Sequence, residues 1–409
     1  MNIFKKRQTL SEEAADTANR FKVMISAAFL MATSAIGPGT LTQVAVFTES
    51  LLTSFSFVIL ISAFLNVGAQ INIWRIISIA KMRGQDIANQ VMPGLGYFVT
   101  FLIVLGGIAF NMGNLAGAGL GLNALTGMNA NLGSAITAGI CIVIFLSKEA
   151  GIAMDFVVRW LGAMMIVLTA YVVVVSDPPV ADAAIRTFMP LELSFYSIVT
   201  IVGGTVGGFI TFAGAHRLLD AGITGQDNLK RVTKSSISGI GVTAIMHVLL
   251  YLAVLGVVTS GIALDPNNPT ASAFFHAAGD FGYRLFGLVL WAAGITSAIG
   301  ASYTTISFFT SFHPKLEKHR KLWIMLFLVM TTSVLVTIGR PVTLLILASS
   351  FNGLILPITL LSILLAAHNK RIIGDYKHPI WMTVFGGIVV ILTTYFGINT
   401  LIETIPQLF

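Results

Sequence analysis

The hydropathy pattern divides the chain into long apolar runs separated by short polar segments. A run of about 20 apolar residues is long enough to cross a bilayer as a helix. Polar and basic residues fill the first 22 positions, and the first apolar run begins after Lys22. The pattern predicts eleven membrane-spanning helices, over residues 23–50, 54–79, 95–124, 132–147, 153–175, 194–219, 236–262, 284–310, 322–339, 342–367 and 379–400.

Two of these spans are interrupted near their middle by helix-breaking residues. The first carries Gly37-Pro38-Gly39-Thr40, and the sixth carries a glycine-rich stretch from Gly203 to Gly208. Proline removes a backbone donor, and glycine lowers helix propensity. Such a break is tolerated at membrane depth only where protein buries it or where it lines a cavity. The two breaks therefore indicate a transport site. A proline kink without a ligand is the alternative for the first break.

The two breaks lie five spans apart, which indicates a repeated architecture. Interrupted helices at corresponding positions of two halves are typical of inverted-repeat transporters. We expect an all-α membrane protein with a five-plus-five inverted repeat, discontinuous helices 1 and 6, and an additional eleventh helix. The predicted parts are a cytoplasmic tail (1–22), a first repeat (23–176), an extracellular loop (177–193), a second repeat (194–370), and the eleventh helix with the C-terminus (371–409).

Composition and charge support a multi-pass membrane protein. Hydrophobic residues make up 56% of the chain and charged residues only 10%, whereas soluble domains carry about 25% charged residues. With the N-terminus inside, all of the 24 Lys and Arg residues except Arg186, Arg284 and Arg340 fall on the inner side. This skew predicts a cytoplasmic N-terminus in the cell (inner) membrane. It also explains the net charge of +7 without a nucleic-acid partner. The single cysteine, Cys141, excludes an intrachain disulfide and a cysteine-based metal site.

The backbone at the two breaks is the first candidate binding surface. Half-helices that start after Gly39 and after Gly208 present free N–H groups and positive dipole ends, which suit a carboxylate. Glycine also lets a ligand approach the main chain closely. The predicted substrate-binding residues are Gly37, Pro38, Gly39, Thr40, Asn111, Asn114, Thr205, Gly207, Gly208, Phe209 and Ser349. Thr211 and Phe212 are further candidates for a hydroxyl and an apolar wall. For each threonine, hydrogen bonding back to its own helix is the alternative interpretation.

Ionisable residues within the spans need a separate explanation, because a charge there is costly. His247 lies in the middle of the seventh span and is the first candidate for proton coupling, with Glu49 as the second. A neutral histidine bonded across helices, and a wet position at the mouth for Glu49, are the alternatives. Three residues close the sixth span and are candidates for an inner gate, or for simple interfacial anchoring: His216, Arg217 and Asp220.

Four short motifs resemble the NRAMP family of proton-coupled divalent-metal transporters. They are Gly84-Gln85-Asp86-Ile87-Ala88, the stretch Gly121–Gly127 at the end of the third span, Ala293-Gly294-Ile295-Thr296-Ser297, and Leu354-Ile355-Leu356-Pro357. The resemblance covers most of spans one to ten and implies the LeuT-type fold. The branch is divergent, because the metal-binding motifs of the family are missing.

The residues that the family uses for the metal differ here. The family breaks its first helix at Asp-Pro-Gly-Asn, and the matching positions here run from Gly37 to Thr40. The family's Met-Pro-His in the sixth helix corresponds to Gly207, Gly208 and Phe209. An Asp and a Glu of the third helix correspond to Asn111 and Asn114, and a glutamine of the tenth helix corresponds to Ser349. A dication held by neutral groups alone faces a severe desolvation cost, so no metal site is expected.

These observations favour a secondary active transporter for a small organic solute, a carboxylate or an amino acid, coupled to H⁺ or Na⁺. A divalent-metal transporter with an atypical site and a non-transporting membrane sensor are the alternatives. The sequence carries no P-loop and no His-Glu-x-x-His motif, and we expect neither an enzyme nor a cofactor. The expected partners are a small-molecule substrate and the lipid bilayer, and the oligomeric state is left open.

Overall fold

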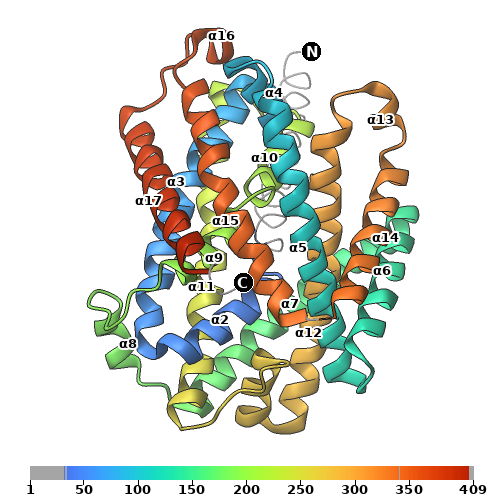
Figure 1. Ribbon diagram of the computed structural model, residues 1–409, viewed down its shortest axis with the longest axis vertical. Helices are drawn as coiled ribbons and strands as arrows, with labels where there is room; N and C mark the ends of the chain where they lie inside the picture. The colour runs from blue at the N-terminus through green and yellow to red at the C-terminus, as the bar shows by residue number, and fades with distance from the viewer. Residues whose placement is uncertain (1–31, 33–34, 340, 405–409) are drawn as a thin grey trace, which may run out of the picture.

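The computed structural model describes Ala32, residues 35–339 and residues 341–404. For residues 148–159, 161, 163, 401, 403 and 404 it describes the backbone only. The predicted cytoplasmic tail, most of the first half of the first span, and residues 405–409 lie outside the described residues. Figure 1 shows a bundle of helices that run mostly along the long axis of the molecule.

The described helices follow the order of the predicted spans. They are α2 (Pro38–Leu51), α3 (Phe55–Ala80), α4 (Gly84–Val91), α5 (Leu95–Thr126), α6 (Ala130–Leu146), α7 (Lys148–Ser176), α8 (Val180–Arg186), α9 (Phe195–Val206), α10 (Ile210–Asp220), α11 (Leu229–Thr259), α12 (Pro269–Thr310), α13 (Pro314–Lys318), α14 (Arg320–Ile338), α15 (Pro341–Ala366), α16 (Lys370–Ile373) and α17 (Ile380–Thr404), with short 3₁₀ turns at Leu52–Ser54 and Gln226–Asn228.

Length and hydropathy identify the helices suited to a bilayer. Among the described residues, eight helical stretches are long and apolar enough to cross a membrane, and α6 is a shorter apolar helix. One of the eight, Pro38–Ala80, joins α2 and α3 through the 3₁₀ turn and therefore covers parts of two predicted spans. Large apolar side chains such as Phe64, Phe101 and Ile391 are exposed, which is expected of surfaces that face lipid.

The helical boundaries depart from the prediction most strongly in the eighth span. It was predicted to begin at 284, but α12 begins at Pro269 and bends at Gly279, where φ is +64° and ψ is −161°. Proline at the first helical position is compatible with a helix start, because its missing N–H has no partner there. The additional turns form a cap at the end of the molecule that also carries α8, at the bottom of Figure 1. We call this end the α8 end, and the opposite one the α4 end.

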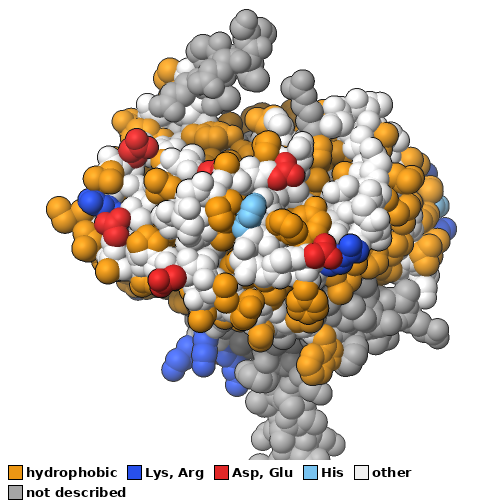
Figure 2. All heavy atoms as spheres, turned by 90° about the horizontal axis from the view of Figure 1, so that it is seen from below, with side chains coloured by type: hydrophobic (Ala, Val, Ile, Leu, Met, Phe, Trp, Pro, Cys, Tyr) orange, Lys and Arg blue, Asp and Glu red, His pale blue; other side chains and the backbone are white. Residues whose placement is uncertain are grey.

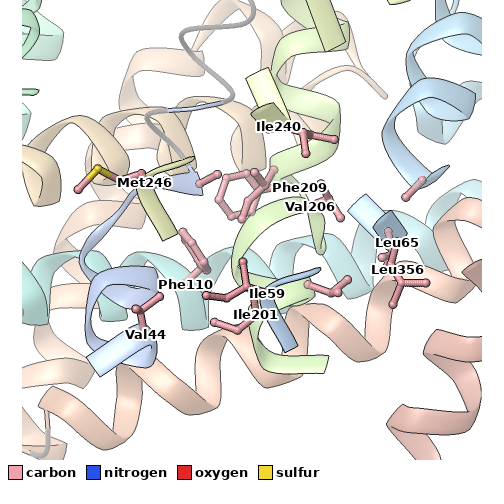
Figure 3. Packing of buried hydrophobic residues seen from close by; sticks show 14 of the residues in the cluster. Val44, Ile59, Leu65, Phe110, Ile201, Val206, Phe209, Ile240, Met246 and Leu356 are labelled. Atoms are coloured by element: carbon pink, nitrogen blue, oxygen red, sulfur yellow. The ribbon is translucent and has the colours of Figure 1, made fainter. Parts of the chain in front are cut away.

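Burial places the sixth span at the centre of the bundle. The most apolar window of Phe195–Asp220 is entirely buried inside the protein, whereas that of Ile380–Thr400 is 33% buried. The eleventh helix, α17, therefore packs from outside, chiefly against α15 and α9. Figure 3 shows Val44 of α2, Ile201 and Val206 of α9, and Phe209 among the apolar side chains of this central region.

Candidate functional site

The first span is broken at Ile36 and Gly37. Ala35 is helical, Ile36 and Gly37 form a bend, and α2 starts at Pro38. Gly37 is extended, with φ −82° and ψ 173°, and no side chain caps the start of α2. Thr40 closes the break from the other side, because its hydroxyl donates to the Ala35 carbonyl at 2.6 Å. The predicted break is thus present, and a hydroxyl satisfies a carbonyl that the bend leaves without its usual helical partner.

The sixth span is broken at Gly207, Gly208 and Phe209. Gly207 is extended after α9, Gly208 has a left-handed φ of +53°, and α10 starts at Ile210. Glycine adopts this conformation without the steric cost that other residues bear. No side chain caps the start of α10 either. Both half-helices therefore begin with amide groups that are not used by a capping side chain.

Several of the predicted binding residues lie together between these breaks. A Cβ atom on Gly37 would lie 2.8 Å from Ser297 Oγ and 3.1 Å from Asn114 Oδ1. A Cβ atom on Gly204 would lie 3.3 Å from both Thr40 Oγ1 and Ser349 Oγ. The first break, the third helix, the tenth helix and the sixth helix thus share one buried polar region.

Gln43 belongs to this region and was missed in the sequence. It is fully buried, and its Nε2 donates to Ser349 Oγ and, at 3.4 Å, to the Leu345 carbonyl. Among the described residues, its Oε1 has no hydrogen-bond partner. Its position three residues after Thr40 could have identified it in the sequence. This spacing puts both polar side chains on one face of a helix within an apolar run. Ser297 belongs to the motif Ala293–Ser297 that resembles the family, and its place beside Gly37 could not be predicted from sequence spacing.

Asn352 of α15 is the second residue that the sequence did not reveal. Its Nδ2 donates to the Gly106 and Ala348 carbonyls at 3.0 and 2.8 Å. Its Oδ1 is buried without a partner, and a Cβ atom on Gly208 would overlap it. Asn352 therefore occupies the space that a side chain at the sixth-span break would need.

Three predicted binding residues have other partners. Asn111 donates to Thr331 of α14 at 2.8 Å and accepts from Ser302 of α12 at 3.4 Å, so its amide is occupied away from both breaks. Thr205 donates to the Ile201 carbonyl in its own helix at 2.8 Å, which is the alternative interpretation. Phe209 is buried edge-on against Phe110, with ring centroids 5.4 Å apart, and belongs to the apolar cluster in Figure 3.

The two proton-coupling candidates lie in different surroundings. His247 of α11 is buried and its Nε2 has no partner, while its neighbour Met246 packs in the cluster with Phe209 in Figure 3. Glu49 is exposed at the end of α2, where its carboxylate accepts the backbone N–H of Leu264 at 2.9 Å. Glu49 thus joins α2 to the segment that leads into α12.

The gate candidates lie at the α4 end and contact α4 and the turn before it. Asp220 forms an ion pair of 2.7 Å with Arg83, and His216 accepts the backbone N–H of Gly84 at 3.2 Å. Arg217 is exposed. Burial raises the pKa of the Asp86 carboxyl in α4, and the neighbouring Arg83 opposes that shift. The end of α10 is therefore tied to the start of α4, which the spacing of His216 and Asp220 alone did not indicate.

A cavity of about 340 Å³ opens at the α8 end. It is lined by Asp265, Asn268, Ser272, Phe275, His276, Asp280 and Tyr283. Figure 2 shows this end, where acidic side chains are spread among apolar and neutral ones. The carboxylates here already have partners, since Asp265 accepts the Asn267 N–H at 2.9 Å and Asp280 pairs with Arg284 at 2.8 Å.

The side chains that line this central polar region carry no charge. Its polar groups come from Thr40, Gln43, Asn114, Ser297 and Ser349. In the part of the chain that the structure describes, no group of three or more His, Cys, Asp or Glu side chains is arranged to hold a metal ion. The site can offer hydroxyl and amide groups and the uncapped starts of two half-helices.

Interrupted first and sixth helices around a buried polar centre, in an all-helical chain, define a membrane transporter of the LeuT-type fold. A model of the natural resistance-associated macrophage protein-like (Nramp) family matches residues 28–403, and the chain belongs to this family. Members of the family are transporters rather than enzymes. The predicted fold class and family resemblance are thus confirmed.

Similar proteins include two bacterial membrane proteins. The uncharacterized membrane protein YcsG of Bacillus subtilis is 55% identical over 97% of this chain and 98% of its own length. An uncharacterized membrane protein of Haemophilus influenzae is 51% identical over 97% of this chain and its full length. The matches therefore cover nearly all of this chain and of both relatives.

Solved structures share the fold at low sequence identity. A mutant of the manganese transporter of Eremococcus coleocola has a TM-score of 0.71 and 16% identity, covering 93% of this chain and 86% of that chain. MhsT in complex with L-phenylalanine has a TM-score of 0.67 and 15% identity, covering 93% and 97%. Identity this low establishes the fold alone.

Proposed function

We propose that the protein is a secondary active transporter that moves a small organic solute, a carboxylate or an amino acid, by alternating access. The observation that carries the proposal is the neutral, buried polar region between the two breaks. A divalent ion needs anionic or several strong oxygen, nitrogen or sulfur ligands when it leaves water. Thr40, Gln43, Asn114, Ser297 and Ser349 supply only neutral groups at this position.

The uncapped starts of α2 and α10 support a carboxylate group on the solute. Neither half-helix has a side chain that caps its first N–H groups. Helix starts bind anions because these N–H groups and the helix dipole point the same way. Because Gly37 has no side chain, the polar side chains of Ser297 and Asn114 lie close to the first start.

The transport cycle is coupled to H⁺ or Na⁺, and His247 is the residue for the proton case. It is buried in α11 and its Nε2 has no partner. Replacing His247 with Gln in proteoliposomes tests this role. We expect the pH dependence of uptake to flatten, and an unchanged pH profile would remove His247 from the mechanism.

A second candidate is the transport of a divalent metal such as Mn²⁺, Fe²⁺ or Mg²⁺ through an atypical site. The likeness to the Eremococcus coleocola manganese transporter favours it. The oxygens of Thr40, Gln43 and Asn114 would then act as ligands. The desolvation cost of a dication among neutral groups weighs against this candidate.

The experiment that separates the two candidates screens the purified protein by thermal unfolding. The probes are the twenty amino acids, small mono- and dicarboxylates, and MnCl₂, CdCl₂ and MgCl₂. Stabilisation by a carboxylate or amino acid, followed by uptake of the same compound into proteoliposomes, is the expected result. Micromolar, saturable binding of a divalent ion that is lost in Thr40→Val would instead establish the metal candidate. Binding without uptake would identify a sensor.

A further inference from the structure

Three side-chain oxygens converge on the Cα atom of Gly204. A Cβ atom at that position would lie 2.9 Å from Gln43 Oε1, 3.3 Å from Ser349 Oγ and 3.3 Å from Thr40 Oγ1. The oxygens come from α2 and α15, and all three side chains are fully buried. Glycine at residue 204 keeps the space between them free of a side chain. We call these three oxygens the oxygen node.

Both hydroxyl donors of the node residues point away from it, while Gln43 Nε2 donates to Ser349 Oγ, one of its three oxygens. Thr40 Oγ1 donates to the Ala35 carbonyl at 2.6 Å, and Ser349 Oγ lies 3.4 Å from the Leu345 carbonyl. A carbonyl can only accept, so both hydroxyls turn lone pairs toward the node. The Leu345 carbonyl also fixes the amide of Gln43, since the group 3.4 Å from it must be Nε2.

The remaining atom of the Gln43 amide has no partner. Oε1 is fully buried and accepts no hydrogen bond from any residue that the structure describes. The backbone carbonyl of Gly204 also lies 3.5 Å from Thr40 Oγ1. A buried acceptor without a donor, as at Gln43 Oε1, is unfavourable unless a donor or a cation completes it.

We propose that the oxygen node binds a compact monovalent cation, either Na⁺ or the protonated amine of the solute. Neutral hydroxyl and carbonyl oxygens are the ligands that broken-helix transporters use for Na⁺, and an ammonium group donates hydrogen bonds to the same atoms. A monovalent cation also faces a smaller desolvation cost than a divalent one in such a neutral site.

This inference deepens the proposed function and rests on it, because it assigns the positive charge that accompanies a carboxylate. An amino acid would place its ammonium group at the node and its carboxylate at a half-helix start. A solute without an amine would leave the node to Na⁺. In either case the cation joins the first-span break to α9 and α15, so its binding favours one arrangement of these helices.

The test measures cation binding to the purified full-length protein without any solute. Thermal unfolding is followed in NaCl, methylammonium chloride and choline chloride at constant ionic strength. We expect NaCl or methylammonium to raise the unfolding midpoint by several degrees over choline, and the effective ion identifies the source. The variant Gln43→Met keeps the length of the side chain and should weaken the cation effect at least tenfold.

Gln70→Met is the matched control. Gln70 is also fully buried, its Nε2 donates to the Ser236 carbonyl at 2.9 Å, and its Oε1 has no partner. It lies in α3, outside the node. We expect the cation effect to persist in this variant. If Gln43→Met does not fold, two other variants test the inference. We expect the cation to raise the unfolding midpoint less in Ser349→Ala than in the wild type, and more in Gln43→Glu.

Two results would overturn the inference. One is a wild-type midpoint that neither cation moves, and the other is a cation effect that survives unchanged in Gln43→Met and Ser349→Ala. Failure of the proposed function is a separate outcome. A protein that binds the cation at the node but takes up no amino acid or carboxylate contradicts the proposed function, whereas solute uptake without any cation effect contradicts only the node.

Discussion

The breaks in the first and sixth spans both contain glycine, but the atoms that surround these glycines differ. At Gly37, an added side chain would meet the flexible side chains of Ser297 and Asn114. At Gly207, it would meet backbone, with the Cα atom of Gly203 2.6 Å away. Gly208 adds a left-handed φ of +53°. The first break is thus bordered by adaptable polar groups, while the second is fixed by close packing.

This difference assigns different tasks to the two half-helix pairs. Polar groups without partners gather beside the first break, at Gln43 Oε1 and Asn114 Nδ2. The sixth helix presents mainly backbone to them, and it is packed against α15 through Gly203 and Gly353. We therefore expect changes at the first break to affect ligands first, and changes at the second to affect folding first.

The largest effect is expected for Gly208→Ala. A left-handed non-glycine residue costs about 1–2 kcal/mol, and overpacking against Asn352 adds about 1–3 kcal/mol. The thermal unfolding midpoint and the yield of folded protein should fall together. Gly39→Ala is the control, because its Cβ atom would find its nearest neighbour at an ordinary 3.6 Å. If Gly208→Ala and Gly39→Ala lowered the unfolding midpoint equally, close packing would not distinguish the second break from the first.

Gly37→Ala should separate ligand binding from folding. Its Cβ atom would lie 2.8 Å from Ser297 Oγ, so Ser297 and Asn114 must shift within the binding region. An adjustment of about 1–3 kcal/mol corresponds to roughly 5- to 150-fold in affinity. Uptake of a ¹⁴C-labelled amino-acid mixture into proteoliposomes should fall by about fivefold or more, with little change in the unfolding midpoint. If Gly37→Ala instead lowered the unfolding midpoint and left uptake unchanged, the first break would serve folding rather than ligand binding.

The two threonines beside the breaks provide the third contrast. Thr40→Val removes the donor that satisfies the Ala35 carbonyl across the break, at a cost of about 1–3 kcal/mol. Thr205→Val removes only a bond to Ile201 within a continuous helix, and such bonds contribute little. Chemical or thermal unfolding of both variants measures the difference. Equal stability of the two would mean that Thr40 does not maintain the first break.

The smallest effect is expected at the α4 end, where the second half of the sixth span is tied by Arg83 and Asp220. A partly exposed ion pair contributes about 0–1 kcal/mol, so Asp220→Asn should leave the unfolding midpoint almost unchanged. Hydrogen exchange should nevertheless become faster in α10 relative to α9.

Arg284→Ala is the control, since it removes the exposed pair with Asp280 at the opposite end. No change in α10 exchange is expected there. Identical exchange in wild-type protein and Asp220→Asn would show that the ion pair does not hold α10.

The sequence alone was sufficient to predict the all-helical membrane fold, the two breaks and the family. Each depends on properties carried by consecutive residues: the length of an apolar run, the missing N–H of Pro38, and the conformational freedom of Gly208. The extra helical turns before residue 284 escaped this reasoning, because the stretch from Pro269 to Gly279 is too polar and too short to be identified as part of a span.

The contacts among the polar atoms could not be predicted from the sequence. Asn111 and Asn114 are three residues apart on one helix, yet Asn114 lies beside Gly37 while Asn111 bonds to Thr331. Gln43 reaches Ser349, which is 306 positions away in the chain. Such meetings depend on the rotation and register of packed helices, which close backbone contacts such as Gly203 against Gly353 set. Hydropathy carries no information about that rotation, because every side of a central helix is buried.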